Sequence, residues 1–292
     1  MRVTNNILFD TVDRANALST ERLVAASRVA SDGVRVVKPS DDPAAFATIV
    51  DDDARLAVLA SRSKTIGRVT AELQTAETTL ASAGELLIHA RELSLQASNG
   101  TLDASSRAVI GVEISQIRSA LLSMANTRGS NGYIFGGTRT DTPPFDPTGA
   151  FVGNDNAMTL EIATGVTLRV NPSGARAFTP AGGRDVFADL DALATALGSN
   201  DLVGINTSLD TLDADHRQVL STRVDVGLTC ERLSSSTDVT DTAVEVLRTA
   251  RAQLSEADIV GAYSNLAQAQ SAYERGVQVS KTILSVSSVN RG

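Results

Sequence analysis

A seven-residue repeat of apolar residues between Leu59 and Ala97 constrains the fold more than any other feature of the sequence. Its main column contains Leu59, Ile66, Leu73, Leu80 and Leu87, and a companion column contains Val69, Ala76, Ala83, Ala90 and Ala97. A strict heptad keeps one seam facing a partner helix and imposes a left-handed supercoil. Because no proline falls between Pro43 and Pro143, the pattern predicts one helix from about Asp42 to Asn99, roughly 80 Å long at 1.5 Å per residue.

A second heptad pattern between residues 201 and 257 supplies the partner helix. Its apolar column contains Ile205, Leu212, Val219, Val226, Leu233, Leu247 and Leu254, with Thr240 the polar exception. The helix has a candidate break near Ser234–Ser236, where apolar residues are sparse. Two long helices on either side of a middle segment predict a mainly α fold: an elongated antiparallel coiled-coil or helical-bundle rod formed by both chain ends.

The middle segment differs in texture and predicts a small inserted β-rich domain over residues 131–200. It is rich in proline and glycine, and alternating runs at 158–162 and 166–170 flank a Thr-Gly turn, which is typical of a hairpin. The predicted rod then comprises residues 41–130 and 201–257. A shorter helix that starts at Asp103 is expected to run antiparallel to the first long helix.

Both chain ends, residues 1–40 and 258–292, predict weak amphipathic helices with thin apolar stripes. We expect these stripes to pack against each other or against neighbouring copies, because so little apolar area makes a helix marginal alone. The candidate packing residues are Leu8, Val12, Leu23, Leu266, Tyr273 and Leu284.

Composition and charge argue against several classes of function. The net charge is −8 with acids and bases interspersed, so no basic stripe points to nucleic acid. No run approaches the ~20 apolar residues of a membrane span, and Asp10 and Asp13 interrupt what would be the apolar core of a signal peptide. With a single cysteine and two histidines, both on heptad helices, we find no catalytic, metal or cofactor site and expect no enzyme.

The stretch from Ser31 to Pro43 predicts a helix–turn–helix joint. Gly33 is suited to end one helix, Pro39 favours extended backbone before it, and Asp41 or Asp42 caps the next helix with Pro43 in its first turn.

This joint also carries a family resemblance. The pattern Ser31-x-Gly33-x-Arg35-Val36-x-x-Pro39-Ser40-Asp41-Asp42-Pro43 resembles the N-terminal signature of the flagellin superfamily. Its proline-bearing form, together with Tyr133-Ile-Phe-Gly-Gly-Thr138, is more similar to the hook–filament junction branch than to filament flagellins. The C-terminus departs from the family, since Ser285–Gly292 lacks the usual leucine-rich cluster.

The resemblance implies a structural component of the bacterial flagellum that joins hook to filament and on which flagellin assembles. The implied partners are flagellin, hook-associated protein 1, copies of itself in a ring-like tier, and a flagellar export chaperone with the type III export apparatus. The implied location is extracellular, reached without a cleaved signal peptide. A filament flagellin or minor filament subunit is the alternative within the family, and a signalling or binding coiled coil is the alternative outside it.

Overall fold

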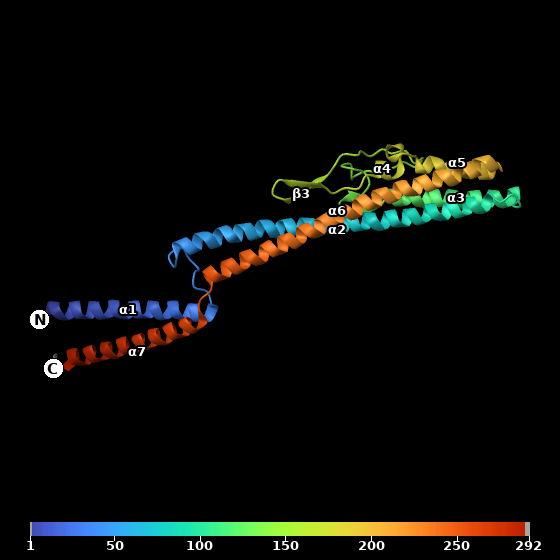
Figure 1. Ribbon diagram of the computed structural model, residues 1–292. Helices are drawn as coiled ribbons and strands as arrows, with labels where there is room; N and C mark the ends of the chain where they lie inside the picture. The colour runs from blue at the N-terminus through green and yellow to red at the C-terminus, as the bar shows by residue number, and fades with distance from the viewer. Residues whose placement is uncertain (1, 290–292) are drawn as a thin grey trace. The chain divides into compact units, whose positions relative to one another are not determined.

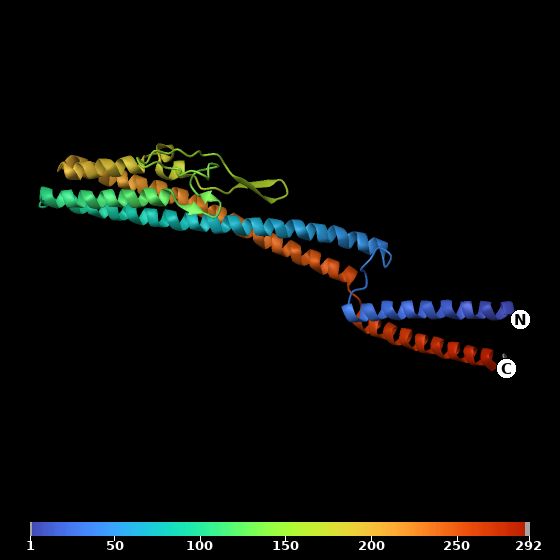
Figure 2. The same cartoon turned by 180° about the vertical axis from the view of Figure 1, so that it is seen from behind.

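A computed structural model describes residues 2–289, and the side chains of Leu8 and Leu284, two of the predicted packing residues, lie outside its described part. The chain divides into two compact units, one made of residues 1–59 and 242–292 and the other of residues 60–241 (Figures 1 and 2). The elements are α1 (Arg2–Asp32), α2 (Pro43–Ala97), α3 (Ala104–Ala125), β1 (Arg128–Gly129), β2 (Gly132–Tyr133), β3 (Thr159–Ala163), β4 (Val166–Arg169), α4 (Gly174–Phe178), the 3-10 turn η1 (Pro180–Gly182), α5 (Val186–Gly198), α6 (Leu202–Ser255) and α7 (Ile259–Val289). The prediction of a mainly α protein with two long heptad helices is confirmed.

The two long helices follow the predicted bounds closely, with one correction. α2 ends two residues before the predicted limit, at Ala97, and α6 covers Leu202–Ser255. The candidate break at Ser234–Ser236 is wrong, because α6 runs through it without interruption. Leu233 is fully buried there, and the Ser236 hydroxyl donates a hydrogen bond to the Ile162 carbonyl at 2.9 Å. Both contacts stabilise α6 across the serine-rich stretch.

In the unit of residues 60–241, α2 and α6 run antiparallel and share one core. Ser94 near the end of α2 donates to the carbonyl of Ile205 near the start of α6 at 3.3 Å. Further along, Arg223 of α6 pairs with Glu77 of α2 at 2.7 Å. The alanine column of α2 is fully buried at Ala76, Ala83, Ala90 and Ala97, as expected where helices approach closely.

Two shorter helices widen this bundle. α3 returns beside α2 and packs against α5, with Asp103 capping its N-terminus by accepting from the Ser106 amide at 2.8 Å. By length and hydropathy α3 alone among the described helices is apolar enough to cross a membrane. Its apolar residues Ile110, Ile114, Ile117 and Leu121 are instead buried in the bundle core.

The segment between α3 and α5 holds the predicted hairpin and an aromatic core. β3 and β4 pair antiparallel with Leu160 opposite Leu168, and these two residues pack on the bundle. Phenylalanine rings with centroids 5.2–5.9 Å apart fill the rest of the segment: Phe135, Phe145, Phe151, Phe178 and Phe187. Offset and edge-to-face ring pairs of this kind add stability beyond the area that they bury.

Candidate assembly surfaces

The joint between α1 and α2 is held by hydrogen bonds to the C-terminal end of α6 and the turn that follows it, all within the unit of residues 1–59 and 242–292. Gly33 has φ +68°, a left-handed conformation that suits glycine at a helix end, and its carbonyl accepts from the Ala257 amide at 2.9 Å. The backbone amide of Arg35 donates to the Ser255 carbonyl at 2.7 Å. Its guanidinium donates to the Leu254 carbonyl at 3.0 Å and to Asp42 at 3.2 Å.

The two aspartates of the joint order its backbone. Asp41 accepts from the amides of Val37 and Lys38 at 3.1 and 3.2 Å and pairs with Arg28 at 3.3 Å. Asp42 caps α2 by accepting from the Ala45 amide at 3.1 Å. These bonds to the ionised form, led by the amides of Val37 and Ala45, lower the pKa of both carboxyls. The predicted helix–turn–helix joint is therefore stabilised by side-chain hydrogen bonds to its own backbone and by an ion pair to α1.

A small apolar cluster lies under the joint. Val36, Ala45 and Ile49 are buried, and Phe46 and Leu254 pack against them. Of the predicted joint residues, Gly33, Arg35, Asp41 and Asp42 take part in these contacts, Pro43 is the first residue of α2, and Pro39 is exposed.

The terminal helices α1 and α7 lie antiparallel to each other (Figure 1). Asn16 of α1 donates to the Ser280 hydroxyl of α7 at 2.5 Å. A Cβ added to Gly276 would lie 2.8 Å from the Asn16 Oδ1 atom, so the helices approach closely there. Between them an open groove of about 780 Å³ is lined mainly by small and polar residues, among them Ser19, Ala26 and Ala272.

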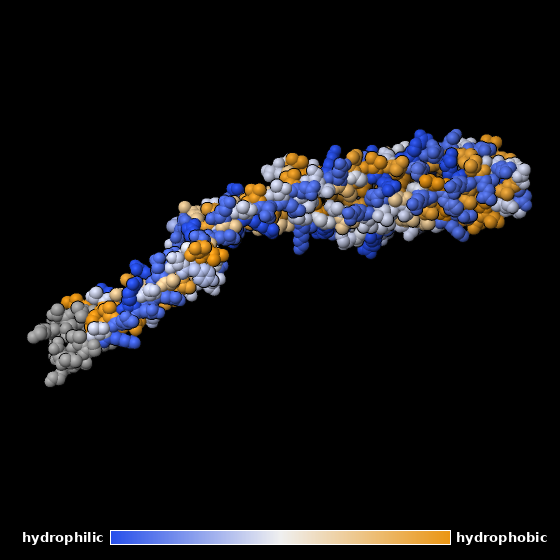
Figure 3. Space-filling model, turned by 60° about the horizontal axis from the view of Figure 1, so that its bottom comes forward, coloured by the Kyte–Doolittle hydropathy of each residue, from blue (hydrophilic) through white to orange (hydrophobic). Residues whose placement is uncertain are grey.

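This helix pair leaves many apolar side chains exposed. Val12, Leu23 and Leu266 are partly buried, whereas Tyr273 is 36% exposed. Among the described side chains of the two helices, eight large apolar ones are exposed, namely Ile7, Leu18, Val24, Ile259, Val260, Tyr263, Tyr273 and Val279. Apolar and polar residues are interspersed along the face drawn in Figure 3. The role of the predicted residues in assembly stays a prediction.

The predicted seam residues lie together in the bundle core, with one exception. Ile66, Leu73, Leu80, Leu87, Leu212, Val219, Val226 and Leu233 have at most 3% exposed surface. Leu59 is only partly buried. Cys230 packs at the edge of this core, and burial raises the pKa of its thiol, which disfavours the reactive thiolate.

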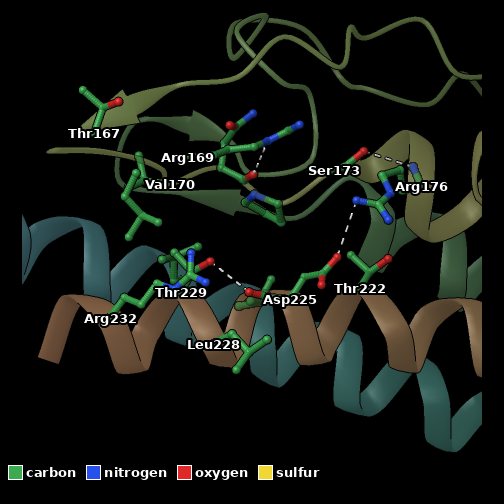
Figure 4. A pocket seen from close by; sticks show the side chains of 15 residues that line it. Thr167, Arg169, Val170, Ser173, Arg176, Thr222, Asp225, Leu228, Thr229 and Arg232 are labelled. Atoms are coloured by element: carbon green, nitrogen blue, oxygen red, sulfur yellow. Dashed lines mark hydrogen bonds and ion pairs between the residues drawn. The ribbon is translucent and has the colours of Figure 1, made fainter. Parts of the chain in front are cut away.

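An open cleft of about 460 Å³ lies between the β4 region and α6 (Figure 4). Arg169, Arg176 and Arg232 line it together with hydroxyl groups such as those of Thr222 and Thr229. Two of the arginines have acidic partners, since Arg169 pairs with Asp155 at 2.7 Å and Arg176 with Asp225 at 3.5 Å. The Arg176–Asp225 ion pair links α4 to α6 across this cleft.

The bundle holds a buried polar centre around Arg107, a residue to which sequence reasoning gave no structural role. Arg107 of α3 is 3% exposed and donates to the carbonyls of Ala97 and Asn99 at 2.8 and 2.9 Å and to the Asn200 side chain at 2.5 Å. Arg107 thus supplies hydrogen bonds to the carbonyl groups at and just after the end of α2 and links them to the turn before α6. The sequence places this arginine on an otherwise apolar helix face, three residues before Ile110, which is the signal that could have identified it.

Comparison with known proteins relates the chain to flagellar proteins. Residues 3–140 match the family model of the bacterial flagellin N-terminal helical region. Flagellar hook-associated protein 3 of Salmonella typhimurium is 28% identical over 61% of this chain and 57% of that protein, so the match spans less than two-thirds of its length. The Escherichia coli protein of the same name is 28% identical over 80% of this chain and 82% of its own length. The flagellar filament 41 kDa core protein of Borreliella burgdorferi is 24% identical over 93% of this chain and 94% of its own.

Solved structures share the fold. FlgL of Bacillus cereus superimposes with a TM-score of 0.60 at 23% identity, over 68% of this chain and 97% of that one. The flagellar junction protein FlgL of Legionella pneumophila gives 0.58 at 16% identity, over 71% and 99%. These structures share the fold with this chain although fewer than a quarter of the aligned residues are identical.

Proposed function

Since this chain carries the bacterial flagellin N-terminal helical region and is related to flagellar hook-associated protein 3, we propose that it is a structural component of the bacterial flagellum that joins the hook to the filament. The observation that carries the proposal is the combination of a well-packed helical bundle with a terminal helix pair whose apolar side chains are exposed. Exposed apolar residues also occur on α2 and α6, but among the described residues of α1 and α7 only Ala262 is buried. The terminal helix pair therefore has no core of its own, and its apolar side chains are available for contacts with other subunits.

The terminal helices are the proposed assembly part. α1 and α7 would insert their exposed apolar side chains between neighbouring copies, which we take to form a ring-like tier, and between this tier and its axial neighbours. The axial neighbours are hook-associated protein 1 on one side and flagellin on the other. Such marginal helices would become ordered only when they dock, which couples their folding to binding. Before docking they would not be ordered, and this would prevent premature assembly.

The other proposed assignments follow from this role. We assign residues 1–40 and 258–292 to the inner assembly domain, residues 41–130 and 201–257 to the helical support, and residues 131–200 to the outer surface. The chain would be exported by the flagellar type III apparatus with a chaperone, and its place would be outside the cell. It would act by packing, without an enzymatic reaction or a cofactor.

Deletion of the gene tests the proposal against the alternative of a filament subunit. The alternative is worth testing because the chain is also 24% identical to a filament core protein. The junction role predicts cells with bare hooks and flagellin monomer lost into the medium, both restored by the full-length gene. Filaments that persist on the hooks, shorter or differently shaped, would contradict the junction role and support a filament subunit. The test is electron microscopy of the cells with immunoblotting of the culture medium.

A further inference from the structure

A buried carboxyl group, that of Asp215, and a partly buried one, that of Asp189, lie where α5 and the loop before it pack against α6, within the unit of residues 60–241. Asp215 of α6 has no exposed surface. No N–H or O–H group of the described residues donates to either of its carboxyl oxygens. Another acid, Asp189 of α5, shares its cation with Asp215: the Arg184 guanidinium lies 2.7 Å from Asp189 and 3.6 Å from Asp215.

Arg184 does not neutralise both acids. Its Nε and Nη2 atoms donate to the two oxygens of Asp189, both at 2.7 Å. The distance from Nε to Asp215 Oδ1 is 3.6 Å, too long for a hydrogen bond. The remaining charge acting on Asp215 is that of Asp185, also an acid. The Arg184 guanidinium therefore hydrogen-bonds Asp189 through two of its nitrogens and interacts with Asp215 only at longer range.

A carboxyl–carboxyl contact of this kind stabilises the fold when one proton is shared. Ionised carboxylates only accept hydrogen bonds, so two of them in contact repel, whereas a protonated acid donates to its neighbour. Burying an ionised carboxylate without a donor is costly. The geometry therefore favours a neutral Asp215 that donates to the Asp189 carboxylate, whose other bonds are to Arg184.

We propose that Asp215 and Asp189 hold one proton between them at neutral pH, and that this proton acts as a latch fixing the start of α5 on α6. Gln218 lies three residues further along the same face of α6 and contacts the segment that precedes α5. Its amide group donates to the carbonyls of Ala177, Thr179 and Arg184 and its oxygen accepts from the Arg184 amide at 2.8 Å. Loss of the proton would leave two adjacent carboxylates against one guanidinium under this docked loop.

The direction of the pH effect follows from the buried state. Burial, followed by the charge of Asp189, raises the pKa of Asp215 to about 8. The native chain then retains a proton that the unfolded chain releases near the ordinary aspartate pKa of about 4. Stability should fall as the pH rises through this interval and level off above pH 8.

Infrared difference spectroscopy of the full chain tests the proposal directly. A protonated carboxyl has a C=O stretch that carboxylates lack. We expect this band at pH 7 in the unaltered protein, with a loss centred around pH 8, and no such band in Asp215→Asn. Absence of the band at pH 7 in the unaltered protein would overturn the proposal whatever the variants do.

Matched variants separate the latch from general carboxyl effects. Between pH 5.5 and 8.5 the melting temperature of the unaltered protein should fall more than that of Asp215→Asn, whose amide can still donate to Asp189. Asp213→Asn is the control, because Asp213 lies nearby on α6 but is half-exposed and pairs with Arg217. It should keep the pH dependence. Parallel profiles for all three proteins would contradict the latch. If Asp215→Asn does not fold, the infrared band of the unaltered protein at pH 7 decides the proposal by itself.

Discussion

Truncation of a seam leucine is expected to destabilise the bundle strongly. Leu80 is fully buried in α2 and borders a cavity of about 100 Å³ that Val219 and His216 of α6 also line. Leu80→Ala removes three carbon atoms, worth about 2.4 kcal/mol at roughly 0.8 kcal/mol per buried methylene. The space left behind enlarges this cavity, and the cavity term brings the expected loss to about 3–5 kcal/mol.

Circular dichroism of thermal and urea unfolding measures this loss. A unit of this size loses about 2–4 °C of melting temperature per kcal/mol, so we expect a decrease of about 6–20 °C in its transition. Leu95→Ala is the matched control, since Leu95 lies on the same helix and is 58% exposed; it should change stability by less than about 1 kcal/mol. Equal effects of the two substitutions would refute the assignment of the heptad column to the core.

Three further predictions concern the other surfaces. Arg107→Ala should cost about 2–4 kcal/mol, because the carbonyls of Ala97 and Asn99 lose a buried charged donor; an unfolding free energy unchanged in urea titration would contradict this role. Acidification below about pH 4 should loosen the joint, because Asp41, whose folded pKa is lowered, stabilises it above that pH and loses this effect as it is protonated. Hydrogen exchange of residues 33–42 should rise on acidification once corrected for intrinsic rates, and Asp41→Asn should raise it already at pH 7, whereas equal protection in the variant would count against the assignment. Deletion of residues 2–32 should leave the unit of residues 60–241 folded by circular dichroism but abolish complementation of a gene deletion, and filaments restored by this truncated chain would exclude the terminal-helix hypothesis.

The heptad helices were predictable because their signal is local and repeated. The seven-residue spacing of Ile66, Leu73 and Leu80 specifies both a helix and its buried face, and the structure buries all three. The hairpin was predictable for the same reason, since alternation and a Thr-Gly turn are short-range patterns. The continuity of α6 through Ser234–Ser236 was not, because it depends on a contact between Ser236 and Ile162, which are far apart in the sequence.

The buried carboxyl group of Asp215 could not be derived from the sequence either. Asp215 falls among many charged residues of α6, and its neighbour Asp189 is brought to it by the folding of the inserted segment. The phenylalanine cluster was missed because its members lie between residues 135 and 187 without a helical or strand period. Of the candidate surfaces, the joint was the most accessible to sequence reasoning, because glycine, proline and aspartate act on neighbouring backbone.

The most direct measurement of the central claim is the position of this chain on the flagellum. The turn at Thr164 and Gly165 between β3 and β4 is exposed, and a Cβ at Gly165 would meet no atom within 4 Å, so an epitope inserted there should leave the bundle intact. Immunogold electron microscopy of a strain that carries the tagged gene then locates the protein. The junction role predicts gold confined to the boundary between hook and filament on flagella of normal length, whereas gold distributed along the filament would contradict it.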